Sequence, residues 1–205
     1  EKAKAIQQVD NAVQAAKNAI NAAGTDAKVT EEQGNGTNAI AGINPSPVAK
    51  PAALAAVAQA AETKKAAIRS NDALTSDEKA EAERKVNEEL AKAQQAIKDA
   101  ADEATVTSEQ GKGTTAISGV AETPVARPAA DKVVEDAATA KRQEIQNNGG
   151  LTDEEKATAK QEAQDKATAA KQAIDNATTN TAVEQAKANG TTEVNNVNPT
   201  PVAKP

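Results

Sequence analysis

Apolar residues recur in steps of three and four along most of the chain, which is the spacing of side chains on one face of an α-helix. The longest such run spans residues 75–101, and its apolar positions are Ala82, Val86, Leu90, Ala93, Ile97 and Ala100. A second run of this kind has its apolar positions at Ala159, Ala163, Ala167, Ala170, Ile174 and Ala177. Such a stripe packs against partner helices. The pattern therefore predicts two long amphipathic helices, the second with a seam built almost wholly of alanine.

Another helix is predicted before each of these runs. Over residues 51–69 the apolar face consists of Leu54, Val57, Ala61 and Ile68, with the stem of Lys65 between them. Pro51 suits the first helical turn, where its missing N–H is not needed. The second copy has Asp131 in the place of Leu54. Its first turn is therefore predicted to be weaker.

The third segment of the pattern contains glycine, yet its spacing is also helical. Its positions step by four, three, four and three, at Val106, Gln110, Gly113, Ile117 and Val120. Two further copies of the segment place Gly36 and Gly190 at the same point. We therefore predict a helix with a glycine on its inward face. This glycine is either a hinge or a point of close helix packing, and we favour packing. A glycine inside a helix costs up to ~1 kcal/mol of helix stability relative to alanine, which predicts fraying nearby.

A threonine and a glutamate three residues apart open each long helix. Thr75 with Glu78, and Thr152 with Glu155, match the capping box, in which the hydroxyl and the carboxylate each accept from a backbone N–H of the first turn. The neighbouring acidic residues, Asp77 and the run 153–155, lie in the same turn, where the helix dipole favours negative charge. These carboxylates are therefore predicted to be capping groups rather than an acid–base pair.

The whole pattern repeats. The sequence Pro-Val-Ala-Lys/Arg-Pro stands at residues 47–51, 124–128 and 201–205, which are 77 residues apart, and all eight prolines lie at these junctions. A fixed long period indicates an array of modules. We predict a partial repeat at 1–46 with the second and third helices only, full repeats at 47–123 and 124–200, and the start of a further linker at 201–205. The partial repeat follows because the chain begins at the position equivalent to Glu78. The chain opens at Glu1 without an initiator Met or a signal peptide, so we expect it to be a piece of a longer protein.

Three helices per repeat set the expected architecture. Three antiparallel helices place the entry and the exit of a module at opposite ends, and proline-rich linkers are semi-rigid and extended. The sequence therefore predicts an all-α protein, made of tandem three-helix bundles of 77 residues that are joined end to end by Pro-rich linkers into an elongated rod.

The composition restricts stability and partners. The chain has no aromatic residue, Cys, Met or His, and its 38% hydrophobic content is largely Ala, so each core is thin and each module is expected to be marginally stable. The 24 basic and 30 acidic residues are interspersed, with a net charge of -6, which predicts a solvated surface and no nucleic-acid partner. No apolar run approaches the length of a membrane span, so no membrane insertion is expected.

No catalytic, cofactor-binding or metal-binding residues are predicted, and the chain is not expected to be an enzyme or to need a cofactor. The glycine pairs at 34–36 and 111–113 lack the preceding strand and the Lys-Ser/Thr ending of a phosphate loop, and no calcium-loop motif is present. High-affinity capture of a partner relies on Trp, Tyr and Arg, and the chain has only Arg69, Arg84, Arg127 and Arg142. Weak contacts multiplied along an array are still compatible with the sequence.

Four segments of the last repeat resemble a known family. They are Leu-Thr-Asp-Glu-Glu-Lys-Ala at 151–157, Ala-Ile-Asp-Asn-Ala-Thr-Thr-Asn at 173–180, Ala-Asn-Gly-Thr at 188–191 and Asn-Pro-Thr-Pro-Val-Ala-Lys-Pro at 198–205. With the period, they resemble the staphylococcal cell-wall surface-protein repeat known as domain of unknown function 1542, over essentially the whole chain. The resemblance implies export to the bacterial cell wall, a role in aggregation, adhesion or biofilm, and no catalytic residues. The chain departs from the pattern at Asp131 and at Ala121-Glu122, where the other copies have Asn-Pro, which raises the question of whether both junctions are equally stiff.

Three functions are weighed against each other. The leading one is an extracellular structural stalk or spacer, in which each repeat has its neighbours in the same chain as partners and holds adhesive domains away from the cell wall. The alternative is that the repeats are themselves weak multivalent adhesive modules that contact host matrix or other cells. The third is a disordered Ala/Lys/Glu-rich chain that folds only on drying; the regular capping boxes and apolar seams argue against it.

Overall fold

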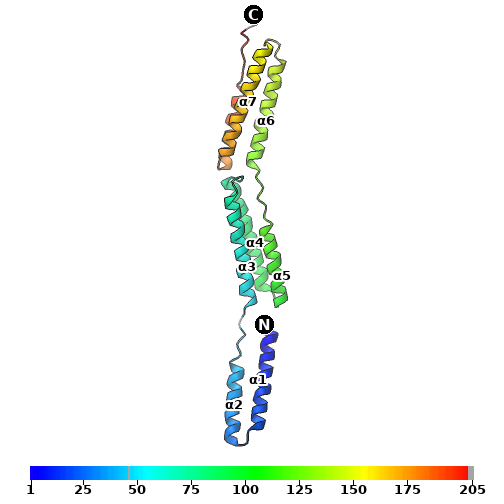
Figure 1. The fold of residues 1–205 in the computed structure, drawn as a ribbon, viewed down its shortest axis with the longest axis vertical. Coiled ribbons are helices and arrows are strands. Elements are labelled where there is room, and N and C mark those ends of the chain that lie inside the picture. Colours follow the sequence, from blue (N-terminus) through cyan, green and yellow to red (C-terminus); the bar gives the residue numbers. More distant parts are fainter. Residues whose placement is uncertain (46, 203–205) are drawn as a thin grey trace. The chain divides into compact units, whose positions relative to one another are not determined.

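The structure is a computed structural model that describes residues 1–45 and 47–202, so the predicted boundary at residue 46 and residues 203–205 of the predicted linker lie outside the described residues. The described residues form eight α-helices and no strand (Figure 1). The helices are α1 (Lys2–Ala22), α2 (Asp26–Ala41), α3 (Ala49–Ser70), α4 (Ser76–Asp99), α5 (Glu103–Ser118), α6 (Ala126–Asn147), α7 (Asp153–Asn176) and α8 (Asn180–Asn195). The predicted all-α class and the tandem repetition of three helices are confirmed.

The helix limits differ slightly from the prediction. The first helix of a repeat begins at Ala49, two residues before Pro51, because this proline fits inside the first turn as well as at its start. The second helix has 24 residues, from Ser76 to Asp99, and is shorter than the predicted 75–101. Thr75 lies outside it because its hydroxyl caps the helix.

The chain divides into two compact units. Among the described residues, the first unit holds 1–60 without residue 46, together with 90–116, and the second holds 61–89 and 117–202. Helices α3 and α4 therefore contribute to both units. Each unit contains one junction between successive repeats.

In the second unit, α6, α7 and α8 contact one another pairwise and form a three-helix bundle. All six predicted seam positions of α7 are buried, and Ala163, Ala167 and Ile174 are 0% exposed. Side chains of the two partner helices complete the core, among them Val134, Ala138, Val183 and Val194. The largest side chains that α7 gives to the core are thus one isoleucine and several alanines, as predicted.

In the first unit, α1 and α2 contact each other along their length and form a helical hairpin (Figure 1). No residue of α1 is buried, and Gly36 is the buried residue of α2. The apolar seam of this hairpin is therefore only half-buried.

Two predicted seam positions on the first two helices of the middle repeat are only half-buried. On the first helix of a repeat, Ala53 and Ala130 face the core with 1% exposure each, whereas Leu54 is half-buried beside them. Ala53, Val57 and Ala61 follow one another at four-residue steps and form the buried face, so Leu54 lies on the flank of that face. On the second helix Leu90 is half-buried, although its counterpart Ala167 is fully buried.

The inward glycine is a point of close packing, as predicted. A Cβ atom added at Gly113 would lie 2.4 Å from the Cβ of Ala93, far inside van der Waals contact. The equivalent distance at Gly190 is 2.2 Å to Ala170, and at Gly36 it is 2.5 Å to Ala16. No described glycine has a positive φ, and α2, α5 and α8 each continue through this position. The fraying near this glycine stays a prediction.

Asp131 is a weak point of the last repeat. It is half-buried on α6, and its Oδ1 atom is buried without a hydrogen-bond partner. Burial raises the pKa of this carboxyl and repulsion from Asp175 adds to the rise, while Lys171 opposes it. The charged form of Asp131 is therefore disfavoured in the folded state.

We expect Asp131→Leu, which restores the residue of the middle repeat, to stabilise the last bundle by about 1–2 kcal/mol at pH 7, because it removes an unsatisfied buried polar group. Asp131→Asn isolates the effect of the charge. Since the folded-state pKa of Asp131 is raised, its negative charge destabilises the folded state fully above that pKa. This destabilisation is absent below the ordinary value of 3.8, where the carboxyl is protonated in both states. Thermal melts followed by circular dichroism should show the gain of Asp131→Asn over the parent shrinking as the pH falls from 7 to 3. A gain that is unchanged at pH 3 would contradict the electrostatic origin.

Candidate functional site: the junction between repeats

The start of α4 is a capping box, as predicted. The backbone N–H of Glu78 donates to Oγ1 of Thr75 at 3.2 Å, and the N–H of Thr75 donates to Oε2 of Glu78 at 2.9 Å. The box at Thr152 and Glu155 has the same two bonds, at 3.3 and 2.9 Å. In both boxes the carboxylate uses one of its two oxygens on its own helix.

The second oxygen of Glu78 binds the start of the next repeat. Its Oε1 atom accepts from the backbone N–H of Val125 at 2.8 Å and of Ala126 at 2.9 Å. Val125 is the N-cap residue of α6 and has no capping hydrogen bond from its own side chain. The first N–H groups of a helix need an acceptor, and here the preceding repeat supplies it. One carboxylate therefore caps two helices, α4 and α6, and the second begins next to a residue that lies 47 positions after the glutamate.

The same bond recurs at the other junctions. Glu1 Oε1 accepts from the N–H groups of Val48 and Ala49 at 2.7 Å each, and Glu155 Oε1 accepts from Val202 at 2.8 Å. Each of these glutamates is again separated from its valine by 47 positions. We call these three carboxylates, Glu1, Glu78 and Glu155, the junction glutamates.

The hydrogen bonds also set the charge state of Glu78. Burial alone raises the pKa of this carboxyl, but the backbone hydrogen bonds of Thr75, Ala126 and Val125 outweigh it, so the pKa lies below its ordinary value. A lowered folded-state pKa means that the ionised carboxylate stabilises the folded state above its unfolded pKa. That contribution is lost as the pH falls through the lowered pKa, so the junction is intact at neutral pH.

A second set of bonds joins the turn before α4 to the turn between α7 and α8. Thr75 is 0% exposed, and its hydroxyl donates to Oδ1 of Asn180 at 2.6 Å. The N–H of Asn180 donates to Oδ2 of Asp77 at 2.7 Å, and the N–H of Ser76 donates to the carbonyl of Thr178 at 2.8 Å. All these residues lie in the second unit, so this junction is a defined contact between two repeats.

The basic residue of the Pro-Val-Ala-Lys/Arg-Pro motif caps the C-terminus of a long helix. Arg127 donates to the carbonyl of Ala177, the C-cap residue of α7, from Nε at 3.2 Å and Nη2 at 2.8 Å. Its Nη1 also donates to the carbonyl of Asp72 at 2.6 Å, in the preceding repeat. In the first unit Lys50 donates to the carbonyl of Lys98 at 2.5 Å. A cation at the C-terminus of a helix is favoured by the helix dipole.

The linkers are held along their sides by an equivalent lysine. Lys64 binds Glu122 at 2.6 Å, and Lys141, which is only 6% exposed, binds Oδ1 of Asn198 at 3.2 Å. Glu122 is one of the two residues that depart from the family pattern. Its hydrogen bond with Lys64 lowers the pKa of the Glu122 carboxyl. The linker after the middle repeat thus keeps its contact with the lysine of the first helix, through Glu122 instead of an asparagine.

The family model described as Domain of Unknown Function (DUF1542) matches the chain three times, at residues 1–48, 49–125 and 126–202. The chain belongs to this family. No curated protein and no solved structure matches it. The second and third DUF1542 matches begin at Ala49 and Ala126, the first residues of α3 and α6. The limits that we predicted, 1–46, 47–123 and 124–200, stay a prediction.

A DUF1542 repeat therefore ends at a valine whose N–H binds a junction glutamate. These valines are exposed: Val48 and Val125 by 63% each and Val202 by 89%. Their side chains contribute little to packing, so the position acts through its backbone.

The other groups that the sequence singled out do not form a site. Arg84 pairs with Glu81 and Glu88 on the exposed face of α4, where such pairs stabilise little. A Cβ atom added at Gly34 or Gly111 would have no other atom within 4 Å. In residues 1–45 and 47–202, no three carboxylates gather closely enough to hold a metal ion. None of the described helices is both long and apolar enough to cross a membrane.

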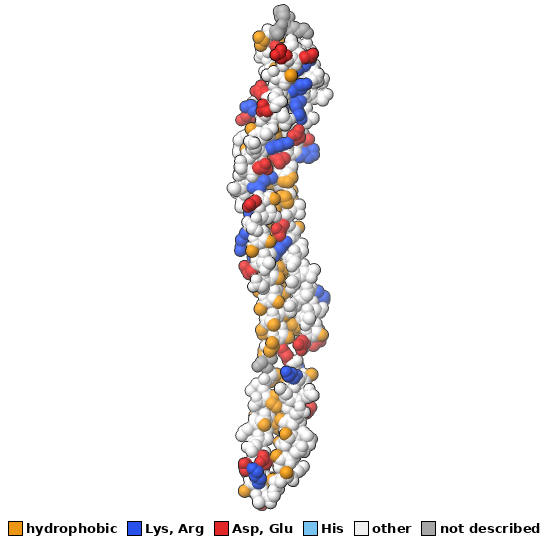
Figure 2. All heavy atoms as spheres, viewed as in Figure 1, with side chains coloured by type: hydrophobic (Ala, Val, Ile, Leu, Met, Phe, Trp, Pro, Cys, Tyr) orange, Lys and Arg blue, Asp and Glu red, His pale blue; other side chains and the backbone are white. Residues whose placement is uncertain are grey.

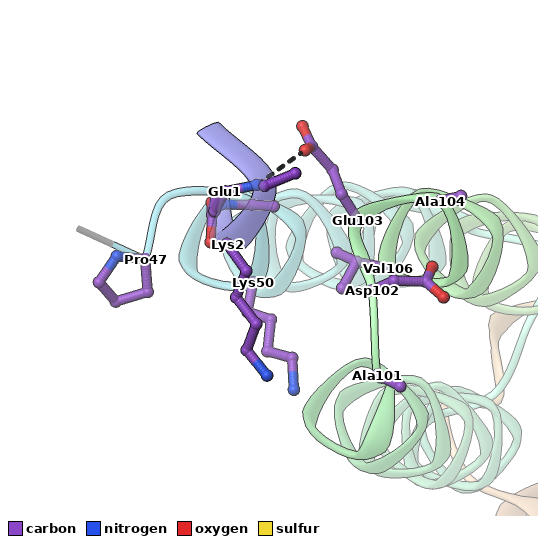
Figure 3. Close-up of a pocket in the computed structure, with 11 residues that line it drawn as sticks. Glu1, Lys2, Pro47, Lys50, Ala101, Asp102, Glu103, Ala104 and Val106 are labelled. Carbon is purple, nitrogen blue, oxygen red and sulfur yellow. Dashed lines mark hydrogen bonds and ion pairs between the residues drawn. The ribbon is translucent and has the colours of Figure 1, made fainter. Parts of the chain in front are cut away.

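A hollow of about 600 Å³ in the first unit lies between the start of α1, the linker at Pro47 and the start of α5 (Figure 3). Glu1 and Glu103 both line it, and the backbone ammonium nitrogen of Glu1 lies 3.6 Å from Oε2 of Glu103. These residues are the counterparts, 77 positions earlier, of Glu78, Pro124 and Asn180. In the second unit Thr75 and Asp77 bind Asn180 at this place. The hollow is therefore part of a junction surface and not a ligand pocket of its own.

Proposed function

We propose that these DUF1542 repeats are a non-enzymatic structural spacer of a bacterial cell-wall surface protein, and that they hold other domains of that protein away from the wall. The observation that carries the proposal is the junction glutamate. A flexible linker would leave successive repeats free to reorient, whereas here one carboxylate caps a helix in each of two repeats.

The surface supports a spacer better than a binding module. Figure 2 shows acidic and basic side chains interspersed on the face in view, and the chain has no aromatic residue to anchor a tight interface. The arginines of the junction are used within the chain, since Arg127 binds Ala177 and Asp72. The location at the cell wall is proposed from the family resemblance.

Small-angle scattering tests the proposal. A second helix of 24 residues is ~36 Å long, so two full repeats and one partial repeat placed end to end should extend over roughly 110 Å, with a radius of gyration of about 32 Å. A compact chain of 205 residues would give about 17 Å. A value near the compact figure would contradict the spacer and favour the adhesive alternative.

Glu78→Ala should broaden the distance distribution measured by scattering, because it frees the start of α6 from the preceding repeat. Glu81→Ala is the matched control on the same helix. The pKa of the Glu81 carboxyl is lowered to about 2 through hydrogen bonding with Arg84, but its ion-pair partners Arg84 and Lys85 are both on α4. Identical distributions for Glu78→Ala and Glu81→Ala would show that the junction glutamate does not fix the repeats.

A further inference from the structure

Asparagine followed by glycine occurs at three places in the sequence, at 35–36, 148–149 and 189–190. Such a pair is prone to an internal reaction, in which the backbone nitrogen of the glycine attacks the side-chain amide of the asparagine. The glycine has no Cβ to hinder the approach. Two of the pairs lie inside α2 and α8, where the helical hydrogen bonds hold the glycine N–H. The pair at 148–149 lies instead in the turn between α6 and α7.

The turn between α6 and α7 prepares Asn148 for this attack. Asn148 follows the helix in an extended conformation, with a φ of -73° and a ψ of 107°. Its Oδ1 atom accepts from the N–H of Gly150 at 2.9 Å, which folds the side-chain amide back over the peptide of Gly149. A donor on this oxygen withdraws electrons from Cγ and stabilises the oxyanion that forms when Cγ is attacked. Asn148 and Gly149 are both exposed, so water reaches them.

The middle repeat has the same turn with a different second residue. Asn71 stands 77 positions before Asn148, and its Oδ1 atom accepts from the N–H of Ala73 at 3.1 Å. Here Asp72 follows the asparagine. Its side chain crowds the attacking nitrogen, and its negative charge opposes the loss of the N–H proton. The Nδ2 atom of Asn71 also donates to Oε2 of Glu122 at 3.4 Å, which holds the side-chain amide. The chain thus contains one reactive turn and one matched turn that is protected.

We propose that Asn148 is a site of spontaneous deamidation, which ages the last repeat without an enzyme. The nitrogen of Gly149 loses its proton to solvent and forms a bond to Cγ of Asn148. The bond between Cγ and Nδ2 breaks, and the amide nitrogen takes up a proton and leaves as ammonia. Water then opens the cyclic imide. Addition of water at Cγ gives aspartate, and addition at the backbone carbonyl gives isoaspartate, whose main chain runs through the side-chain carbon. The net change is the gain of a water and the loss of an ammonia.

The products alter a turn that supports both the core and the linker. Leu151 follows this turn, is 4% exposed and packs in a cluster with Ile145 and Val197. Isoaspartate adds a carbon to the main chain just before it. The new carboxylate also stands at the C-terminus of α6, where the helix dipole disfavours negative charge. In the linker, Cγ of Pro201 lies 3.7 Å from a Cβ added at Gly150. Deamidation therefore loosens the bundle and the linker beside it, and the importance of the second effect rests on the proposed spacer role.

Mass spectrometry of the folded full chain measures the reaction residue by residue. The chain is aged in mildly alkaline buffer and digested, and chromatography separates the aspartate and isoaspartate products from the parent peptide. Asn147 lies in the same peptide and is distinguished by its fragment ions. We expect Asn148 to lose its amide about tenfold faster than Asn71, which corresponds to ~1.4 kcal/mol in the barrier. Asn35 and Asn189 should also lag behind Asn148 in the folded chain, and should react as fast as Asn148 once denaturant has removed the helices.

Gly149→Ala is the matched variant. A Cβ added at Gly149 has no other atom within 4 Å, and the φ of this glycine is not positive, so the variant keeps the turn while it hinders the attack. It should lower the rate at Asn148 about tenfold and leave Asn71 unchanged. Equal rates at Asn148 and Asn71 in the parent, or equal rates at Asn148 in the parent and in Gly149→Ala, would each overturn the proposal. Neither outcome bears on the scattering test, so the spacer and the deamidation site are tested separately.

Discussion

Ile174→Ala is expected to lower the free energy of unfolding of the α6–α8 bundle by about 2–5 kcal/mol, the usual cost of removing a buried isoleucine side chain. Ile174 is 0% exposed, and every other seam residue of α7 is an alanine. No neighbouring side chain of α7 is large enough to fill the cavity. A small bundle with a thin core has a total stability of ~5 kcal/mol or less, so the substitution should unfold the last repeat near room temperature.

Far-UV circular dichroism measures the loss of helix, and hydrogen exchange assigns it to residues 126–197. Fluorescence is of no use here because the chain has no aromatic residue. Val133→Ala is the matched control, since this valine is on α6 but is 44% exposed. A parent and an Ile174→Ala variant that melt within a degree or two of each other would show that the bundle does not depend on this side chain.

Gly190→Ala is expected to destabilise the same bundle by about 1–3 kcal/mol, the usual cost of overpacking a core. Helix propensity alone predicts the opposite, because alanine is favoured over glycine by up to ~1 kcal/mol inside a helix. Packing decides the sign: the new Cβ would lie 2.2 Å from the Cβ and 3.4 Å from the Cα of Ala170. The clash involves a β-carbon fixed to the backbone, so α7 and α8 must separate to relieve it.

Two further variants make the Gly190 result specific. Gly111→Ala should stabilise α5 by roughly 0.5–1 kcal/mol, because nothing lies within 4 Å of the added Cβ; the last repeat already has Ala188 at this position. Adding Ala170→Gly to Gly190→Ala moves the single methyl group to the other helix and should recover most of the lost melting temperature. If Gly190→Ala melts above the parent, propensity and not close packing governs this position.

The sequence predicts the helices well because their signals are local or strictly periodic. The capping boxes need only residues three apart, and the seam of α7 follows from steps of three and four. The inward glycine was identifiable because it occupies a core position of the helical pattern. Leu54 was misplaced for the same reason, since Ala53 and Leu54 are adjacent and the apolar stripe allows either to face inward.

The junction glutamate was only half predicted. The capping box accounts for one oxygen of Glu78, and nothing local indicates a partner 47 residues later for the other. A signal does exist at the far end. Val125 stands where a helix normally has Ser, Thr, Asp or Asn as its N-cap, so α6 needs an acceptor from elsewhere. Lys50 and Arg127 of the linker motif were likewise predicted only as linker residues, although each caps the C-terminus of a helix.

The fixed spacing of the junction glutamates has a consequence for how such a gene can change in length. Each glutamate must meet a valine amide 47 residues ahead of it. A recombination event that adds or removes whole 77-residue units, the interval between Glu1, Glu78 and Glu155, recreates an identical junction at the breakpoint wherever it occurs. An event of any other length leaves one helix start without its acceptor. Copy number is therefore free to vary between lineages, while the length of a single unit is not.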